Sequence, residues 1–311
     1  MKRVMLIALL LTAAAAFSQQ PRNAGSQDLP VPVRLTAQVS ERNVPVTKSD
    51  LYCAGFVSAK PLSREHFVGA GMDSPVQSRY QEREFVFLRG GGYTPGTRVS
   101  IVREVADFNQ YSPFPSAHNL LGKTGRVYSD IGYAKVVENR GTNTAVALAE
   151  FTCDNILPGD LVVPYVERTP VAYRPRTTMG VFPAAPARIS GKIMASRDFD
   201  SYLGSSHAIY LSVGEAQGLK AGDYLRVVRD YRSVSLDQTD AAVSSAADVT
   251  DDTQQHAPKM AKKQEHELPR RVIGEVVVLS THSGGATAII TFALEPIQLG
   301  DTVELEEAEA E

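Results

Sequence analysis

The residues best suited to chemistry are aspartates that follow turn glycines at similar places in two halves of the chain. They are Gly159-Asp160, Gly222-Asp223 and Gly300-Asp301. Carboxylates in pairs can do general acid–base work. An Asp after a turn glycine can instead accept hydrogen bonds from its own backbone. Because the pattern recurs, we favour the structural role and predict no catalytic residues.

Two arginines end strand-like runs that also match between the halves, Arg103 and Arg229. We expect them either to pair with the turn carboxylates or to stay solvated. Gly96 occupies the turn that corresponds to Gly222, so the structural turn residues also include Gly96.

The histidines show no metal-ligand spacing on a shared element. They are His66, His118, His207, His256, His266 and His282. A weak divalent-metal site near His256 and His266 is the alternative to a solvated loop, and we predict no metal. Ser283 beside His282 suggests a hydrolase, but it lacks the Gly-x-Ser-x-Gly frame of such nucleophiles, so we interpret both as turn residues.

Two glycine-rich stretches resemble phosphate-binding loops. They are Gly69-Ala70-Gly71 and Gly90-Gly91-Gly92. Phosphate loops work at the N-terminus of a helix, and no convincing helix follows either stretch. We interpret both as turns and predict no cofactor.

The two cysteines, Cys53 and Cys153, are expected to form a disulfide, with two unpaired buried thiols as the alternative. The prediction depends on export, because disulfides persist in oxidising compartments. Lys2 and Arg3 precede an apolar run from 5 to 16 and small residues at 16 and 18, which is typical of a signal peptide over residues 1–18. We expect an exported chain, periplasmic or secreted, with no transmembrane segment after the signal.

Composition makes some partners less plausible. The formal net charge is −3, and −5 without Lys2 and Arg3, with no basic stripe, so we expect no nucleic acid. The absence of tryptophan disfavours a carbohydrate-stacking surface without excluding it.

An internal repeat sets the architecture. Short strand-like runs with glycine turns, and no long helical periodicity after the signal, predict an all-β chain of two tandem small β-barrel-like modules of about five strands each. Each module is expected to contain a hairpin, with arms at 85–88 and 98–103 in the first module and at 208–213 and 224–229 in the second. The first strand of each module is expected at 53–59 and 191–195. The predicted organisation is a signal peptide at 1–18, a Pro-containing tether at 19–50, module 1 at 51–167, a Pro-rich linker at 168–187, module 2 at 188–306 with a disordered insert at 231–269, and an acidic tail at 307–311.

The phrase Ile-Gly-x-x-x-Val followed by Leu-x-Gly-Asp-x-Val occurs from Ile131. Its first part returns from Ile273, and Gln-Leu-Gly-Asp-Thr-Val at 298–303 stands at the place of its second part. It resembles the C-terminal domain of the bacterial flagellar assembly protein T and of exported LysM-type peptidoglycan-binding proteins, where a Gly-Leu-Lys-x-Gly-Asp hairpin like that at 218–223 precedes it. The resemblance implies a periplasmic, non-enzymatic β module that helps to assemble or attach envelope structures.

The sequence therefore predicts an exported, non-catalytic scaffold or adaptor whose partner is an envelope protein or peptidoglycan. A carbohydrate-binding module and a hydrolase with a cleft between the modules are the alternatives. A local function is expected in the segments that the modules do not share, 104–130 and 231–269, and at the seam between the modules.

Overall fold

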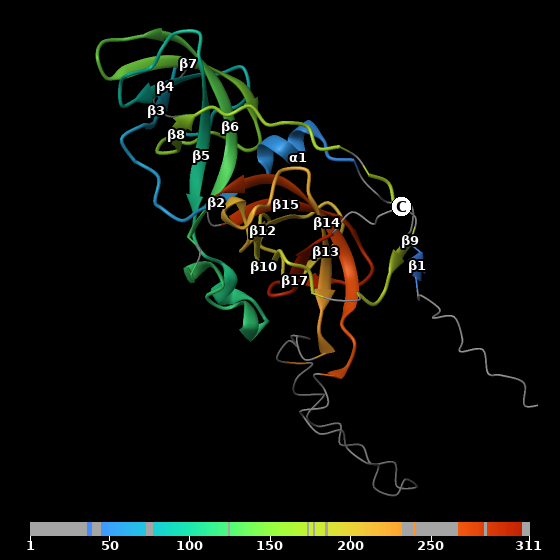
Figure 1. Ribbon diagram of the computed structural model, residues 1–311. Helices are drawn as coiled ribbons and strands as arrows, with labels where there is room; N and C mark the ends of the chain where they lie inside the picture. Colours follow the sequence, from blue (N-terminus) through green and yellow to red (C-terminus); the bar gives the residue numbers. More distant parts are fainter. Residues whose placement is uncertain are drawn as a thin grey trace, which may run out of the picture. The chain divides into compact units, whose positions relative to one another are not determined.

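The computed structural model is an all-β protein with two closed six-stranded barrels (Figure 1), which confirms the predicted fold class. The residues that it describes are 36–38, 45–72, 77–123, 125–172, 174–176, 178–183, 186–231, 239, 267–282 and 285–306. The predicted signal peptide, the acidic tail, Ser283, His256, His266 and most of the tether and of the insert lie outside them. In the described part of the chain, no helix is long and apolar enough to cross a membrane.

The first barrel has the strand order β6-β5-β8-β3-β4-β7, and β7 closes onto β6. Its strands are β3 (Phe67–Gly71), β4 (Phe85–Arg89), β5 (Arg98–Val105), β6 (Arg126–Asn139), β7 (Thr144–Thr152) and β8 (Leu161–Pro164). Their inward side chains form one apolar core, which includes Val86, Leu88, Ile101, Ile131 and Val136. A further short strand, β2 (Phe56–Ser58), pairs with β6 outside the closed barrel.

The second barrel repeats this order as β14-β13-β17-β10-β12-β15, and β15 closes onto β14. Its strands are β10 (Ser190–Ser196), β12 (Ala208–Leu211), β13 (Tyr224–Arg229), β14 (Arg271–His282), β15 (Gly285–Ala293) and β17 (Thr302–Leu305). A small ladder of β11 (Tyr202–Leu203) and β16 (Ile297–Gln298) lies beside it. The two modules thus share one strand order. Because each sheet closes on itself, neither barrel has an open edge.

The predicted hairpins are wrong in their pairing. The four arms are strands, but β4 pairs with β3 and β7, whereas β5 pairs with β6 and β8. In the second barrel β12 and β13 are separated in the same way. The glycine turn instead contacts the neighbouring strand, because the Gly96 N–H donates to Val136 O (2.8 Å) and the Gly222 N–H to Val278 O (2.8 Å).

The predicted first strand of module 1, 53–59, is present only as the short β2 (Phe56–Ser58), which lies outside the closed barrel. Lys48–Cys53 is a helix, α1, which begins with a capping box in which Thr47 and Asp50 bond each other's backbone N–H. The strand that corresponds to β10 is β3. It contains Gly69 and Gly71, which we had assigned to a turn; a Cβ on Gly71 would lie 2.0 Å from the Tyr80 ring. Close packing, and not a turn, therefore explains these two glycines.

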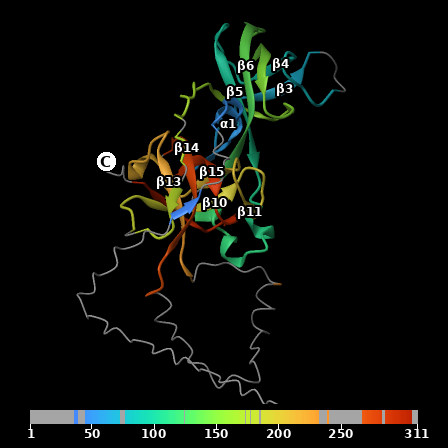
Figure 2. The same cartoon turned by 90° about the vertical axis from the view of Figure 1, so that its right-hand side faces the viewer.

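The segment between β5 and β6 crosses to the second barrel. It contains three short 3-10 helices, η1 (Asn109–Tyr111), η2 (Pro115–Ala117) and η3 (Leu121–Lys123). Phe114 and Ala117 are fully buried in the core of the second barrel, together with Ile193, Leu211 and others. Figures 1 and 2 both show this green segment beside that barrel. This segment, which belongs to module 1 in the sequence, thus completes the core of module 2.

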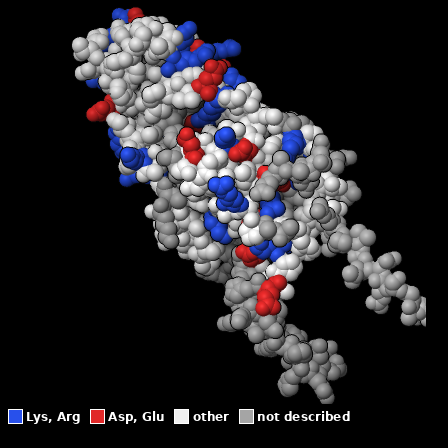
Figure 3. All heavy atoms as spheres, viewed as in Figure 1, with Lys and Arg blue, Asp and Glu red and all other residues white. Residues whose placement is uncertain are grey.

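The Pro-rich linker between the modules contacts the barrels at several of its described residues. Arg168 donates to Asp130 of β6 (2.8 Å), and Arg174 donates to Glu275 of β14 (3.0 Å). Further on, β9 (Thr178–Gly180) pairs with β1 (Thr36–Gln38). Figure 3 shows acidic and basic side chains interspersed over this face of the molecule. The predicted linker is therefore a strap that is held against both barrels.

The two modules meet through α1 and β2. Leu51 and Ala54 are buried against Val277, Leu279 and Ile289 of the second barrel. Three buried hydrogen bonds cross the same seam: Tyr210 Oη to Ala54 O (3.0 Å), Thr287 Oγ1 to Gly55 O (2.9 Å) and Asn109 Nδ2 to Met194 O (2.7 Å). Buried apolar contacts and satisfied polar groups therefore join the barrels.

Gly55→Ala should destabilise the protein more than Gly141→Ala. Both glycines have a φ of 73°, so an alanine at either position costs about 1–2 kcal/mol of backbone strain. At Gly55 the new Cβ would also lie 2.4 Å from Tyr210 Oη and 2.7 Å from Tyr128 O, whereas nothing lies within 4 Å at Gly141. We expect an added cost of about 1–3 kcal/mol for this overpacking, measured by urea unfolding. Equal costs for the two variants would contradict the close packing at the seam.

Candidate functional site

The turn carboxylates are bound by arginines in the same way in both barrels. Asp160 Oδ1 accepts from Arg103 Nε (2.7 Å), and Asp160 Oδ2 accepts from Arg103 Nη2 (2.9 Å) and from the Leu157 N–H (2.7 Å). Arg103 Nη2 also donates to Asn155 O (2.8 Å). Of the two roles considered for Arg103, the structure shows pairing.

The second barrel repeats each of these contacts. Asp301 Oδ1 accepts from Arg229 Nε (2.9 Å), and Asp301 Oδ2 accepts from Arg229 Nη2 (2.6 Å) and the Gln298 N–H (2.7 Å). Arg229 Nη2 donates to Pro296 O (2.8 Å). These bidentate pairs join β5 to the turn before β8, and β13 to the turn before β17, so the carboxylates act as ties between strands.

The other predicted turn residues have the geometry of turns. Gly96, Gly159, Gly222 and Gly300 have φ values of 87°, 94°, 91° and 93°, which L side chains rarely adopt. Asp223 Oδ2 accepts from the Lys220 N–H at 2.8 Å, so it caps its own turn. These residues stabilise the barrels and do not converge on one site.

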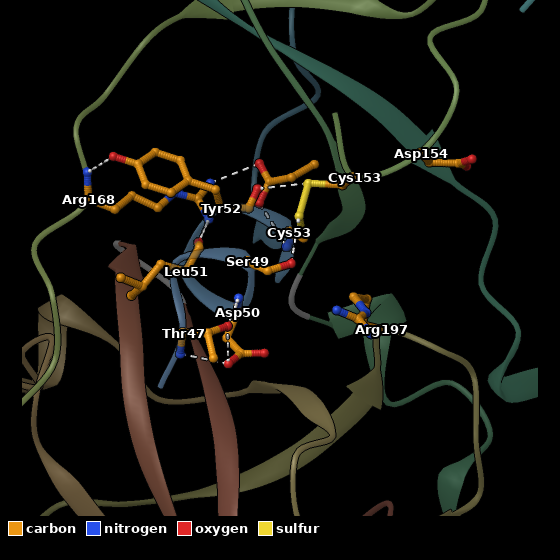
Figure 4. The surroundings of a disulfide bond; sticks show 12 residues. Thr47, Ser49, Asp50, Leu51, Tyr52, Cys53, Cys153, Asp154, Arg168 and Arg197 are labelled. Carbon is orange, nitrogen blue, oxygen red and sulfur yellow. Dashed lines mark hydrogen bonds and ion pairs between the residues drawn. A yellow bond between two sulfur atoms is a disulfide. The ribbon is translucent and has the colours of Figure 1, made fainter. Parts of the chain in front are cut away.

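The disulfide joins Cys53 at the end of α1 to Cys153, which follows β7. Figure 4 shows the bond at the C-terminal end of the short helix, with Tyr52 and Arg168 on the side of the strap. The Tyr52 hydroxyl accepts from the Arg168 N–H (3.1 Å) and from Tyr165 Oη (3.1 Å). The disulfide thus fixes the element that carries the seam between the modules.

The described histidines lie apart from one another. His66 contacts Tyr93, His118 bonds Ser112 O, His207 lies 3.3 Å from Asp200, and the His282 ring packs on Phe56. Among the described residues, no three His, Cys, Asp or Glu side chains could hold a metal ion. The geometry therefore gives no metal centre in this part of the chain.

The half-buried His282 and the buried Asp130 lie near Arg168 at the seam. Burial raises the pKa of the Asp130 carboxyl above its usual range, although the Arg168 guanidinium and the Gly55 N–H oppose this rise. Burial and then the charge of Arg168 lower the pKa of His282, and the carboxylates of Asp130 and Glu215 oppose that fall. Shifted pKa values also occur at active sites, but here both groups face a packed seam, and Asp130 is tied to Arg168 and Gly55.

The lowered pKa of His282 should make the protein less stable as the pH falls. The unfolded chain binds a proton at His282 near pH 6.5, whereas the folded protein resists that proton until a lower pH. The contribution of His282 to stability is therefore full above about pH 6.5 and is lost as the pH falls through the folded pKa.

His282→Gln removes this titration, so its free energy of unfolding should fall less than that of the wild type between pH 7.5 and pH 5. The exposed His118→Gln is the control and should fall as the wild type does. A wild-type slope in His282→Gln would show that His282 does not carry the effect.

A hollow of about 120 Å³ opens where the crossing segment meets the second barrel. Aromatic rings, small hydroxyl groups and one amide line it. Its lining residues are Phe108, Asn109, Tyr111, Ser112, Ser196, Phe199, Ser201 and Leu299. We call it the aromatic hollow. Three of its rings are open to solvent, with Tyr111 exposed by 77%, Phe199 by 42% and Phe108 by 39%.

Hydrogen bonds hold η1 in place at the edge of the aromatic hollow. The Asp107 carboxylate accepts from the Asn109 N–H (2.8 Å), which starts the turn. The buried Asn109 amide donates to Met194 O of β10 (2.7 Å), so η1 is tied to the second barrel. Tyr111 is thereby presented on a fixed turn.

Phe199 is held in an unusual backbone conformation on the opposite side of the aromatic hollow. Its φ is 62°, which is an outlier for a bulky residue. Its ring lies against that of Phe108, with 3.9 Å between the ring centroids. Strained residues of this kind are concentrated at functional sites, where surrounding contacts maintain them.

Sequence reasoning named the segment 104–130 as a place to look but missed the aromatic hollow itself. Phe108 and Tyr111 lie in that segment, whereas Phe199 and Ser201 come from the loop after β10. Only the crossing of the segment to the second barrel brings them together, and no local pattern records it.

Comparison with known proteins adds no family to this picture. No protein-family model and no curated protein sequence matches the chain.

Proposed function

We propose that this chain is an exported, non-catalytic binding protein of the cell envelope that uses the aromatic hollow to bind an envelope protein or a cell-wall polymer. The observation that carries the proposal is the group of three exposed rings, Phe108, Tyr111 and Phe199, on two fixed turns. Exposed aromatic groups in one place are typical of interaction sites.

Export is supported by the charged and apolar start of the sequence and by the disulfide, since disulfides persist outside the reducing cytosol. The resemblance of the Ile-Gly and Gly-Asp phrases to flagellar assembly protein T and to LysM-type exported proteins agrees with an envelope role.

A non-catalytic role is supported by the use of the carboxylates. Asp160 and Asp301 are each bound by an arginine and a backbone N–H, so they are not free to act as acid or base. The proposed alternative of a hydrolase needs a cleft between the modules. The buried residues Leu51, Ala54 and Tyr210 fill the seam, which favours binding over hydrolysis.

The test is sedimentation of the full exported chain with purified insoluble cell wall, together with cross-linking to envelope proteins. We expect binding that Tyr111→Ala weakens and Tyr231→Ala does not; Tyr231 is also an exposed tyrosine (55%) but lies outside the aromatic hollow. Binding that is independent of Tyr111, or release of soluble wall fragments by the protein, would overturn the proposal.

A further inference from the structure

We infer that the ligand of the aromatic hollow is an uncharged saccharide unit, presented by a longer glycan. This inference rests on the proposed binding function of the same site and names the chemistry of its ligand. A pyranose ring has apolar C–H faces and a rim of hydroxyl groups, so a site for it needs ring surfaces and small polar groups together.

The lining of the aromatic hollow has this composition. The exposed parts of the Phe108, Tyr111 and Phe199 rings offer apolar surface. Besides Tyr111, the hydroxyl-bearing residues of the lining are the serines at 112, 196 and 201. The Ser112 hydroxyl accepts from the Phe114 N–H, and the buried Ser196 hydroxyl donates to Asp200 O. Tyrosine combines an aromatic ring with a polar hydroxyl, which suits a ligand whose faces are apolar and whose rim carries hydroxyl groups.

None of the eight lining residues carries a charge. The carboxylates close to them in the chain make contacts outside the lining: Asp107 accepts from the Asn109 N–H, Asp198 pairs with Arg197 (2.8 Å), and Asp200 lies 3.3 Å from His207. A charged ligand would therefore lose its hydration without gaining an ionic partner among the lining residues. An uncharged ligand loses nothing of this kind.

The size of the aromatic hollow also limits the ligand. Sites that enclose a whole drug-sized ligand have volumes of about 300–1,000 Å³. The aromatic hollow is smaller, at about 120 Å³, so it can hold at most one unit of a chain and leaves the rest outside. The exposed Tyr202, which follows Ser201, extends the aromatic surface beyond the lining for a neighbouring unit.

The geometry favours a pre-formed site. Asn109 ties η1 to β10, Phe199 packs on Phe108, and the Tyr202 ring packs edge-on against the buried Phe114 (5.0 Å between centroids). A pre-formed surface spends little free energy on ordering when a ligand binds.

The test is a titration of the full exported chain with neutral tetrasaccharides of glucose and of N-acetylglucosamine, followed by calorimetry and by NMR of aromatic side chains. We expect binding to at least one of them and weaker binding of tetragalacturonate, which is anionic. Tyr111→Ala should weaken binding at least tenfold, about 1.4 kcal/mol. Tyr111→Phe should retain most of the affinity, and Tyr231→Ala should bind as the wild type does.

The outcomes separate this inference from the proposed function. If no neutral tetrasaccharide binds, but an envelope protein binds in a manner that depends on Tyr111, then the saccharide is wrong and the binding function stands. If no saccharide, cell wall or protein binds in a manner that depends on Tyr111, both the saccharide inference and the proposed binding function are wrong. Preferred binding of tetragalacturonate would overturn the uncharged class. Far-UV circular dichroism of each variant shows whether a loss of binding reflects a loss of fold.

Discussion

Replacing Cys53 and Cys153 together by alanine should lower the free energy of unfolding by about 4–5 kcal/mol. The disulfide joins residues 100 positions apart, and a closed loop of that length restricts the unfolded chain by about 4.7 kcal/mol in the chain-entropy account. In addition, the free end of α1 would no longer hold Leu51 and Ala54 against the second barrel. Urea unfolding monitored by circular dichroism measures the change.

The matched control for this prediction is the reductant itself. Wild-type protein under reducing conditions should approach the stability of the double variant, and the double variant should not respond to reductant. In the described part of the chain both cysteines are in this disulfide, so no other described thiol complicates the comparison. A loss below about 1 kcal/mol would show that the loop is already restricted in the unfolded state.

Asp301→Asn should cost about 3–5 kcal/mol, because the buried Arg229 guanidinium loses its two-point carboxylate partner and keeps only the more distant Glu295, 3.5 Å from Nη1. The Arg229 side chain is 5% exposed and that of Asp301 is 2% exposed. Both carboxylate oxygens accept hydrogen bonds, from Arg229 and from the Gln298 N–H. An asparagine has one acceptor oxygen, so its amide N–H₂ would face a donor in either orientation.

The first barrel supplies the control within the same molecule. Asp160→Asn removes the same set of contacts, but the Arg103 side chain is 29% exposed and water can solvate the guanidinium. We expect a cost of about 1–3 kcal/mol there. Equal costs at the two sites would show that burial of the arginine does not decide the effect. Costs near zero at both would show that the pairs are not structural ties.

The local features of the two modules could be predicted from the sequence. Glycine at a turn with positive φ, followed by Asp, is a short-range pattern, and Gly159-Asp160 and Gly300-Asp301 carry it in both halves. The disulfide followed from residue type and compartment. The closed barrels followed from many short strands that need their edges paired.

The predictions that failed concern features that depend on contacts between segments distant in the sequence. The strand order of β4 and β5 is set by barrel closure, which a hairpin pattern does not reveal. Helix α1 was missed because its signature is the capping box of Thr47 and Asp50, and not an apolar period. The aromatic hollow was missed because Phe108 and Phe199 come from different modules and meet only in the folded chain.

The placement of Phe114 and Ala117 in the core of the second barrel has a consequence for the order of folding. During synthesis the first barrel is complete in sequence at Pro164, before any strand from β10 onward has emerged. Until the strands of the second barrel pair, Phe114 has no apolar partner there. Without Phe114, in turn, the core of the second barrel is incomplete. The two modules therefore share one strand order but assemble as one unit, and separating them would expose an apolar surface on each.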